Sequence, residues 1–171
     1  TQPTGKQSTK LASHGCYYTR TTGIWQTVWL EFTPENYIKS VKKLIDELPI
    51  DFDSQRIYIA GTSFGGFCVW HLAYFYPDSF AAAVPVMGGL SFGCDFEKYD
   101  VQRLIKTPLW VAHSSDDTNV RIDSDDYYVT ELEKLGADVK YTRWNKYGHS
   151  MYKRFYKTEK WVDWCLSKEL K

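Results

Sequence analysis

The spacing at which apolar residues recur differs from one segment of this chain to the next, as it does when helices alternate with strands. Residues 37–48 carry apolar side chains at helical spacing, between Thr33, which can cap a helix, and Pro49, which ends it. RIYIA, residues 56–60, is a short β-branched run typical of a strand buried on both faces of a parallel sheet. An apolar helix is then predicted over residues 67–76.

The alternation continues to the C-terminus. Further strands are predicted over residues 80–87, 108–113 and 138–144, and further helices between Asp95 and Ile105, from Asp123 or Ser124 to Leu135, and around residues 159–170. Strands that alternate with helices favour βαβ units and a largely parallel sheet. We therefore predict a single α/β domain over residues 1–171, with a flexible polar terminus at residues 1–10 and two strand-capable segments within residues 11–32.

Composition excludes several classes of protein. Lysine plus arginine and aspartate plus glutamate both number 21, so the net charge is zero and there is no electrostatic footprint for nucleic acid or an anionic membrane. No apolar run approaches the roughly 20 residues that span a bilayer, which predicts a soluble protein. The four cysteines form no C-x-x-C pair, and no metal or organic cofactor is implied. The compartment stays open.

The most informative motif is Gly61-Thr62-Ser63-Phe64-Gly65, a G-x-S-x-G pattern between a predicted strand and a predicted helix. A sharp turn of this kind holds the serine in a strained conformation and exposes its hydroxyl, and we expect glycines at 61 and 65 because a Cβ there would collide across the turn. The N–H of Phe64 is the natural first donor to an oxyanion. The plain alternative is a tight turn between a strand and a helix that needs small residues.

A serine nucleophile requires an acid and a histidine later in the chain, each after a later strand. Asp116 and Asp117 follow the strand at 108–113, and the residues alone do not separate them; Asp95 follows another strand and is a lesser candidate for the acid. His149 follows the strand at 138–144 and is the candidate base.

Three other histidines have plainer interpretations. His113 ends a buried strand and is expected to be a structural histidine with satisfied hydrogen bonds. His71 lies inside the helix after the serine, and His14 lies in the polar N-terminal region.

These motifs resemble the α/β-hydrolase esterases, in particular the polyhydroxybutyrate depolymerase, feruloyl and acetyl-xylan esterase and predicted peptidase group. The similarity covers roughly residues 34–171 and rests on RIYIAGTSFGG, on PLWVAHSSDDTNV, which is similar to a strand ending in H-G-x-x-D-x-x-V, and on YGHSMY. The resemblance implies a three-layer α/β sandwich with a mostly parallel sheet. It also places the acid on Asp117 and the base on His149.

The sequence departs from that pattern in two small ways and one large one. Ser114 replaces the usual glycine after the strand histidine, and Phe64 stands where methionine is common. This superfamily normally has about four strands before the serine and an early H-G-x-G loop with a second oxyanion donor. Only 62 residues precede Ser63, and Ser13-His14-Gly15-Cys16 is a faint echo of that loop.

The short N-terminal half predicts an unpaired sheet edge. Three explanations fit: a fragment or processed product, consistent with an opening Thr1 and no signal-peptide core; a second chain that completes the sheet, including self-association; or a reduced substitute formed by residues 11–32.

The leading functional prediction is a serine hydrolase of carboxylic esters, with Ser63 as nucleophile, His149 as base, Asp117 as its orienting acid and Phe64 N–H at the oxyanion. Its substrate would be a small-molecule or polymer-linked ester. The alternatives are a serine peptidase of the same fold and an incomplete hydrolase that acts as a binding module.

Overall fold

The computed structural model describes residues 42–47, 52–91 and 95–170. The four strands are β1 (Tyr58–Thr62), β2 (Ala82–Val86), β3 (Leu109–Ser114) and β4 (Val139–Trp144). The helices are α2 (Phe64–Phe75), α3 (Asp123–Lys134), α4 (Met151–Thr158) and α5 (Trp161–Leu166), with 3₁₀ turns η1 (Phe96–Lys98), η2 (Val101–Leu104) and η3 (Gly148–Ser150). No helix within these residues is long and apolar enough to cross a membrane.

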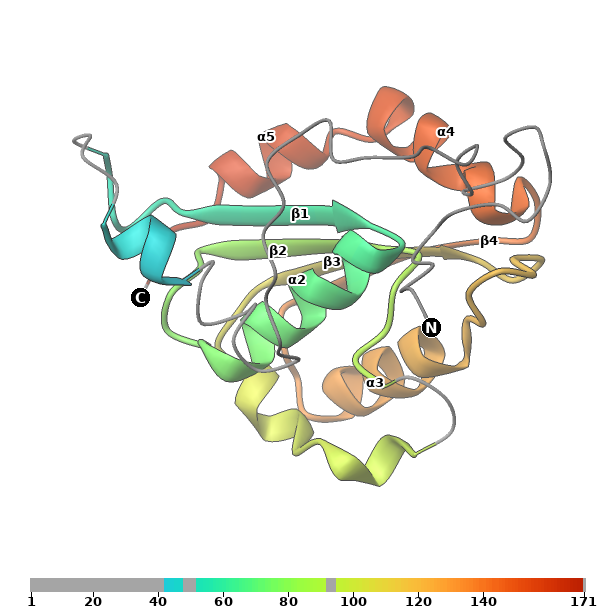
Figure 1. Cartoon of the computed structure of the whole chain (residues 1–171), viewed down its shortest axis with the longest axis horizontal. Helices are drawn as coiled ribbons and strands as arrows, with labels where there is room; N and C mark the ends of the chain where they lie inside the picture. Colours follow the sequence, from blue (N-terminus) through green and yellow to red (C-terminus); the bar gives the residue numbers. More distant parts are fainter. Residues whose placement is uncertain (1–41, 48–51, 92–94, 171) are drawn as a thin grey trace, which may run out of the picture. The chain divides into compact units, whose positions relative to one another are not determined.

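The strands form one parallel sheet in the order β1-β2-β3-β4, which confirms the predicted sheet (Figure 1). β1 lies at one edge of the sheet as described; Ala60 is exposed and its other residues are only partly buried, whereas those of β2 and β3 are buried throughout. The pairing of that edge with a further segment or a second chain stays a prediction.

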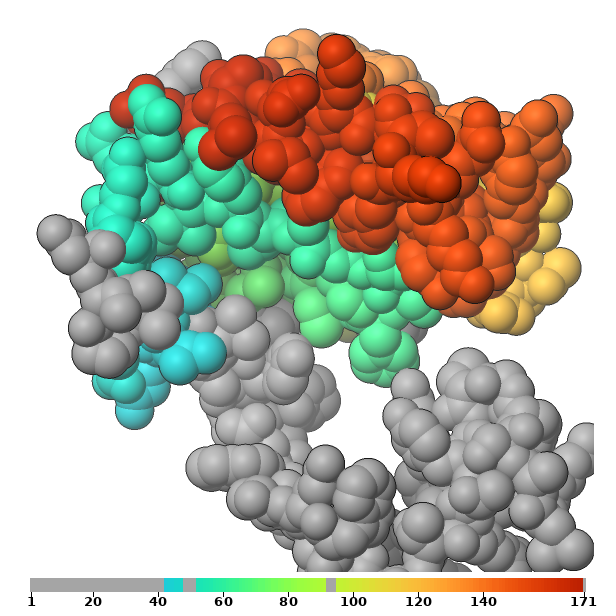
Figure 2. All heavy atoms as spheres, turned by 90° about the horizontal axis from the view of Figure 1, so that it is seen from above, coloured from blue at the N-terminus to red at the C-terminus, as the bar shows by residue number. Residues whose placement is uncertain are grey.

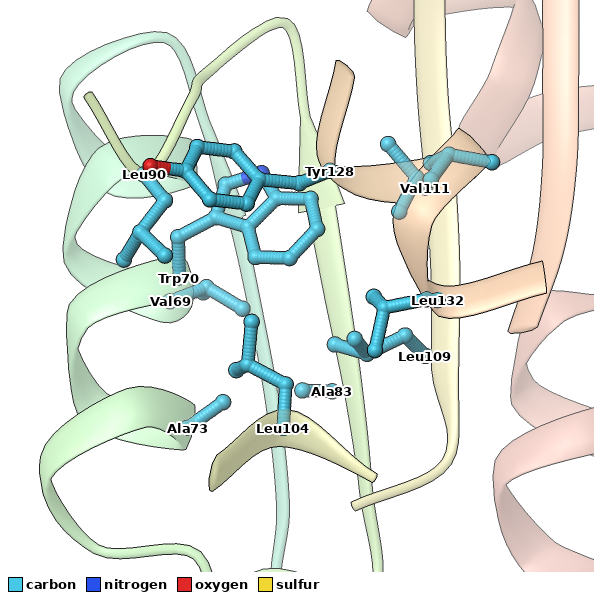
Figure 3. Close-up of a cluster of buried hydrophobic side chains, with 11 residues drawn as sticks. Val69, Trp70, Ala73, Ala83, Leu90, Leu104, Leu109, Val111, Tyr128 and Leu132 are labelled. Atoms are coloured by element: carbon cyan, nitrogen blue, oxygen red, sulfur yellow. The ribbon is translucent and has the colours of Figure 1, made fainter. Parts of the chain in front are cut away.

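Helices cover both faces of the sheet, as the resemblance implied (Figure 1). On one face, α2, η2 and α3 enclose a cluster that includes Trp70, Leu104 and Tyr128 (Figure 3). On the other face, α4 and α5 bring Met151, Phe155 and Cys165 against the strands, and Figure 2 shows these two helices as a red and orange layer.

Alternate residues of β3 pack against the helices on opposite faces of the sheet. Leu109 and Val111 pack in the cluster under α2 and α3, while Trp110 and Ala112 pack under α4 and α5. Side chains of a strand alternate between its two faces, so a continuous apolar run is what a central strand requires.

Several predicted boundaries differ from the structure. The strand predicted at 56–60 is β1 at 58–62, and α2 begins at Phe64, directly after Ser63, instead of at residue 67. The helix predicted between Asp95 and Ile105 is two 3₁₀ turns, η1 and η2. Residues 42–46 are helical, in agreement with the first predicted helix, whereas the predictions for residues 1–32 lie outside the described residues.

The predicted cap of α3 was wrong. Ile122 precedes the helix, and no side chain caps it. The two predicted caps have other partners: the Asp123 carboxylate accepts a hydrogen bond from Arg121, and the buried Ser124 hydroxyl accepts the N–H of Ser91.

The C-terminal helix predicted around 159–170 is the shorter α5, and α4 was missed. Met151 and Phe155 of α4 are buried, and Tyr152 and Tyr156, also four positions apart, pack against the same cluster, so the eight residues do carry a short helical pattern that was overlooked.

Two of the three glycines around Ser63 lie where a Cβ would collide with neighbouring backbone. A Cβ on Gly61 would lie 2.4 Å from the Gly65 carbonyl oxygen, as expected, but a Cβ on Gly65 would have no described atom within 4 Å. The expectation for Gly65 was therefore wrong. The second close approach is instead at Gly66, whose Cβ would lie 2.6 Å from the Val86 carbonyl oxygen.

We expect Gly66→Ala to lower the free energy of unfolding by about 1–3 kcal/mol, because backbone atoms of β2 must move away from the new methyl group. Gly65→Ala is the matched control and should leave it unchanged or raise it by up to about 1 kcal/mol, since a helical glycine is replaced without a clash. Urea unfolding of both variants gives these values. Equal destabilisation by the two substitutions would contradict the packing described for α2.

Candidate active site

Ser63 occupies the sharp turn between β1 and α2. Its backbone has φ 58° and ψ −117°, a conformation that side-chain-bearing residues rarely adopt. The turn is held from both sides: the Ser63 N–H donates to the Val86 carbonyl at the end of β2, and its own carbonyl accepts from Phe67 N–H in α2. The strained turn predicted from the motif is therefore present, and Phe64 is the first residue of the helix.

Strained backbone conformations cluster at the carboxyl ends of the strands. The non-glycine residues with positive φ within the described part of the chain are Ser63, Met87 and Tyr147, at 58°, 51° and 88°. Ser63 and Met87 directly follow β1 and β2, and Tyr147 lies in the turn after β4. Each such conformation costs on the order of 1–3 kcal/mol and is typical of functional sites. In open α/β sheets ligands bind at the carboxyl edge of the strands, which is this edge.

His149 joins the serine to an acid. It lies in η3, after β4, and its Nε2 is 3.0 Å from Ser63 Oγ while its Nδ1 is 2.7 Å from Asp117 Oδ2. A carboxylate can only accept, so Nδ1 carries the proton and Nε2 is left to accept a hydrogen bond from the serine hydroxyl. The side chain of His149 is one quarter exposed, whereas that of Asp117 is fully buried.

The loop after β3 fixes the Asp117 carboxylate. Its Oδ1 accepts the N–H groups of Asn119 and Val120 at 2.8 and 3.1 Å, which leaves Oδ2 for His149. These bonds replace the water that the buried carboxylate has lost.

Asp116 and Asp117, which the sequence could not separate, have different partners. Asp116 Oδ1 accepts hydrogen bonds from the Ser114 hydroxyl at 2.5 Å and from Gly148 N–H at 3.1 Å. The bond from Ser114 lowers the pKa of Asp116. Asp116 thus ties the loop after β3 to the loop that carries His149, while Asp117 meets His149 itself.

The remaining candidates lie elsewhere. Asp95 precedes η1, and its carbonyl accepts a bond from Ser91. His71 bonds the Phe67 carbonyl and the Tyr99 hydroxyl, and His14 lies outside the described residues. His113 is buried and hydrogen-bonded, as expected, but its partner Asp125 was not anticipated.

Neither a metal cluster nor the hollow on the α4–α5 side adds a residue to the candidate site within the described part of the chain. Nowhere in residues 42–47, 52–91 and 95–170 do three histidine, cysteine or acidic side chains group as a metal site would require. A hollow lined by residues that include Trp110, Lys140 and Trp164 lies on the α4–α5 side and contains none of the candidate site residues.

Several known proteins similar to this chain are named as peptidases, depolymerases or esterases. The sequence pattern of the prolyl oligopeptidase family matches residues 22–92, which include Ser63. Poly(3-hydroxyalkanoate) depolymerase C of Paucimonas lemoignei is 38% identical over 52 residues, which are 29% of this chain and 13% of that protein.

Solved structures give the fold. A thermostable esterase superposes with a TM-score of 0.66 and 32% identity over 78% of this chain and 36% of its own. SOBER1 of Arabidopsis thaliana superposes with a TM-score of 0.60 and 22% identity over 77% of this chain and 63% of its own. The chain therefore has the α/β-hydrolase fold and resembles esterases of that superfamily, and it spans about a third of the length of the thermostable esterase.

Proposed function

We propose that this chain carries the catalytic centre of a serine hydrolase that cleaves carboxylic esters. The observation that supports it most is the continuous hydrogen-bonded line from Ser63 Oγ through His149 to Asp117, with contacts of 3.0 and 2.7 Å. The line stands at the strained carboxyl edge of the sheet, where a substrate can approach the serine.

Each residue has one task in the proposed mechanism. Ser63 Oγ attacks the acyl carbon while His149 Nε2 takes the hydroxyl proton, and Asp117 steadies the imidazolium that forms. The tetrahedral intermediate places its oxyanion toward the N–H of Phe64, at the N-terminus of α2, where the helix dipole favours negative charge. His149 then returns the proton to the leaving alcohol, and an acyl-enzyme remains on Ser63.

Water completes the cycle. His149 takes a proton from a water molecule, the hydroxide attacks the acyl carbon, and the proton passes back to Ser63 Oγ as the carboxylic acid leaves. No step requires a metal or a redox cofactor.

The proposed substrates are small or polymer-linked esters. Similarity to a poly(3-hydroxyalkanoate) depolymerase and to a thermostable esterase favours an ester bond. A serine peptidase of the same fold is the second candidate, because the prolyl oligopeptidase pattern covers the segment around Ser63.

Matched chromogenic substrates separate these candidates. We expect the 171-residue chain to hydrolyse p-nitrophenyl esters of short acids, with a burst of p-nitrophenol equal to the enzyme concentration as the acyl-enzyme forms. The corresponding p-nitroanilides should turn over far more slowly. Faster cleavage of the anilides would favour the peptidase, and no turnover of either by folded protein would favour a binding module.

A further inference from the structure

A second histidine–aspartate pair lies behind the proposed acid. His113, near the end of β3, and Asp125, in the first turn of α3, are both completely buried, and the His113 Nδ1 to Asp125 Oδ2 distance is 2.7 Å. The proposed reaction uses neither residue. Burying two ionisable side chains is costly unless each is fully paired, so their placement calls for a physical account.

The hydrogen bonds of His113 determine how many protons the pair holds. Its Nε2 lies 3.1 Å from the Val120 carbonyl oxygen, which can only accept, so Nε2 carries a proton and donates. The contact between Nδ1 and Asp125 then needs a second proton, shared between the two groups. The pair is therefore neutral overall and keeps an N–H directed at the loop after β3.

Opposing influences act on the proton of this pair. Although burial of the ring opposes its charged form, the hydrogen bond to Asp125 raises the pKa of His113 above its ordinary value, whereas complete burial raises the pKa of Asp125 and disfavours its carboxylate. Asp125 Oδ1 also accepts the indole N–H of Trp70 at 2.8 Å. Trp70 comes from α2, the helix that follows Ser63, and packs beside Tyr128 in the buried cluster (Figure 3).

The Nε2–H of His113 lies beside the Asp117 carboxylate. Its Nε2 is 3.4 Å from Asp117 Oδ2, on the same oxygen that His149 Nδ1 contacts at 2.7 Å. Val120 connects the two side chains a second time, because its N–H donates to Asp117 Oδ1 and its carbonyl accepts from His113. Rotation of the Asp117 carboxylate would therefore break contacts on both of its oxygens.

We propose that His113 and Asp125 are a buried positioning pair that holds the Asp117 carboxylate, and the loop that carries it, in the orientation that receives His149. This rests on the proposed function, since positioning matters only if His149 acts as a base. His113 touches no reacting atom and works through Asp117. The chain of contacts runs from Trp70 in α2 through Asp125 and His113 to Asp117.

Two amide substitutions of His113 separate positioning from packing. In His113→Asn the amide replaces the Nδ1 side of the ring and can still bond Asp125, but nothing reaches Val120 or Asp117. In His113→Gln the longer side chain returns a donor to the Nε2 position. Both variants lose ring volume, so a purely structural role predicts similar losses of stability and activity. His71→Gln, at a half-buried histidine bonded to Tyr99, is the control.

Ester turnover per folded molecule is the first readout. We expect His113→Asn to lower kcat about 10- to 100-fold with KM within about twofold, as displaced supporting groups do. His113→Gln should recover kcat to within about threefold of the unsubstituted chain, and His71→Gln should leave it unchanged. Equal losses in both His113 variants, or wild-type kcat in folded His113→Asn, would overturn the proposal.

The second readout does not depend on catalysis. The proton between His149 Nδ1 and Asp117 should give a low-field ¹H NMR resonance without substrate, present in the unsubstituted chain and His113→Gln and lost from His113→Asn. Persistence of that resonance in His113→Asn would overturn the positioning role. If the unsubstituted chain hydrolyses no ester but the resonance follows this pattern, the proposed function fails and the positioning pair stands.

Discussion

Replacing Ser63 with alanine is expected to lower kcat for ester hydrolysis by about 10⁵- to 10⁶-fold, because the variant has no atom that can form the acyl-enzyme. Binding should survive, since only one oxygen is removed from a turn whose backbone bonds to Val86 and Phe67 remain. The measurement is kcat and KM on the best p-nitrophenyl ester, together with the p-nitrophenol burst, which should disappear.

Ser115→Ala is the matched control for that loss. Ser115 is exposed and lies in the loop after β3, so removal of its hydroxyl should leave kcat unchanged. A Ser63→Ala variant that is folded and retains even a tenth of the activity would exclude Ser63 as the nucleophile.

The second large effect is expected at Asp117. Asp117→Asn should lower kcat about 10⁴-fold, because an amide N–H facing His149 Nδ1 favours the tautomer whose Nε2 bears the proton and cannot accept one from Ser63. The measurement is single-turnover acylation at neutral pH, where the chemical step is observed without product release.

Asp116→Asn provides the comparison one residue away. Asp116 accepts from Ser114 and Gly148 and does not contact His149 Nδ1, so we expect no more than about a tenfold loss from a loosened loop. A larger loss at Asp116 than at Asp117 would contradict the assignment of the acid.

A site residue could be predicted from the sequence where the residues next to it form a recognisable pattern. Ser63 could be located because its glycine, its strand and its helix lie within a few positions of it. Ser63 and His149 are 86 positions apart, and the sequence could bring them together only through the rule that parallel strands end at the same edge.

The choice between Asp116 and Asp117 shows where that rule stops. Both residues follow β3, and the difference lies in which hydrogen-bond donors meet each carboxylate. Ser114 and Gly148 N–H occupy Asp116, while the backbone of residues 119–120 turns Asp117 toward His149. From the residues alone both assignments stood, and only the resemblance to known esterases favoured Asp117.

Asp125 had no sequence signal at all. It lies within Asp123-Ser124-Asp125-Asp126, a run that looks like a solvated acidic helix start. Two adjacent carboxylates of this run have different surroundings. Asp125 faces inward to His113 and Trp70, while Asp126 pairs with Arg143 near the surface. Such a difference depends on the rotation of α3 against the sheet, which a local pattern does not reveal.

The most direct test of the catalytic centre is the site at which a fluorophosphonate reacts. The 171-residue chain is treated with the reagent, its intact mass is measured, and the labelled peptide is mapped beside Ser63→Ala and His149→Ala. We predict one adduct per molecule, located on Ser63, absent from Ser63→Ala and formed far more slowly in His149→Ala. Folded protein that remains unlabelled, or an adduct on another residue, would contradict the assignment of Ser63 and His149 as nucleophile and base.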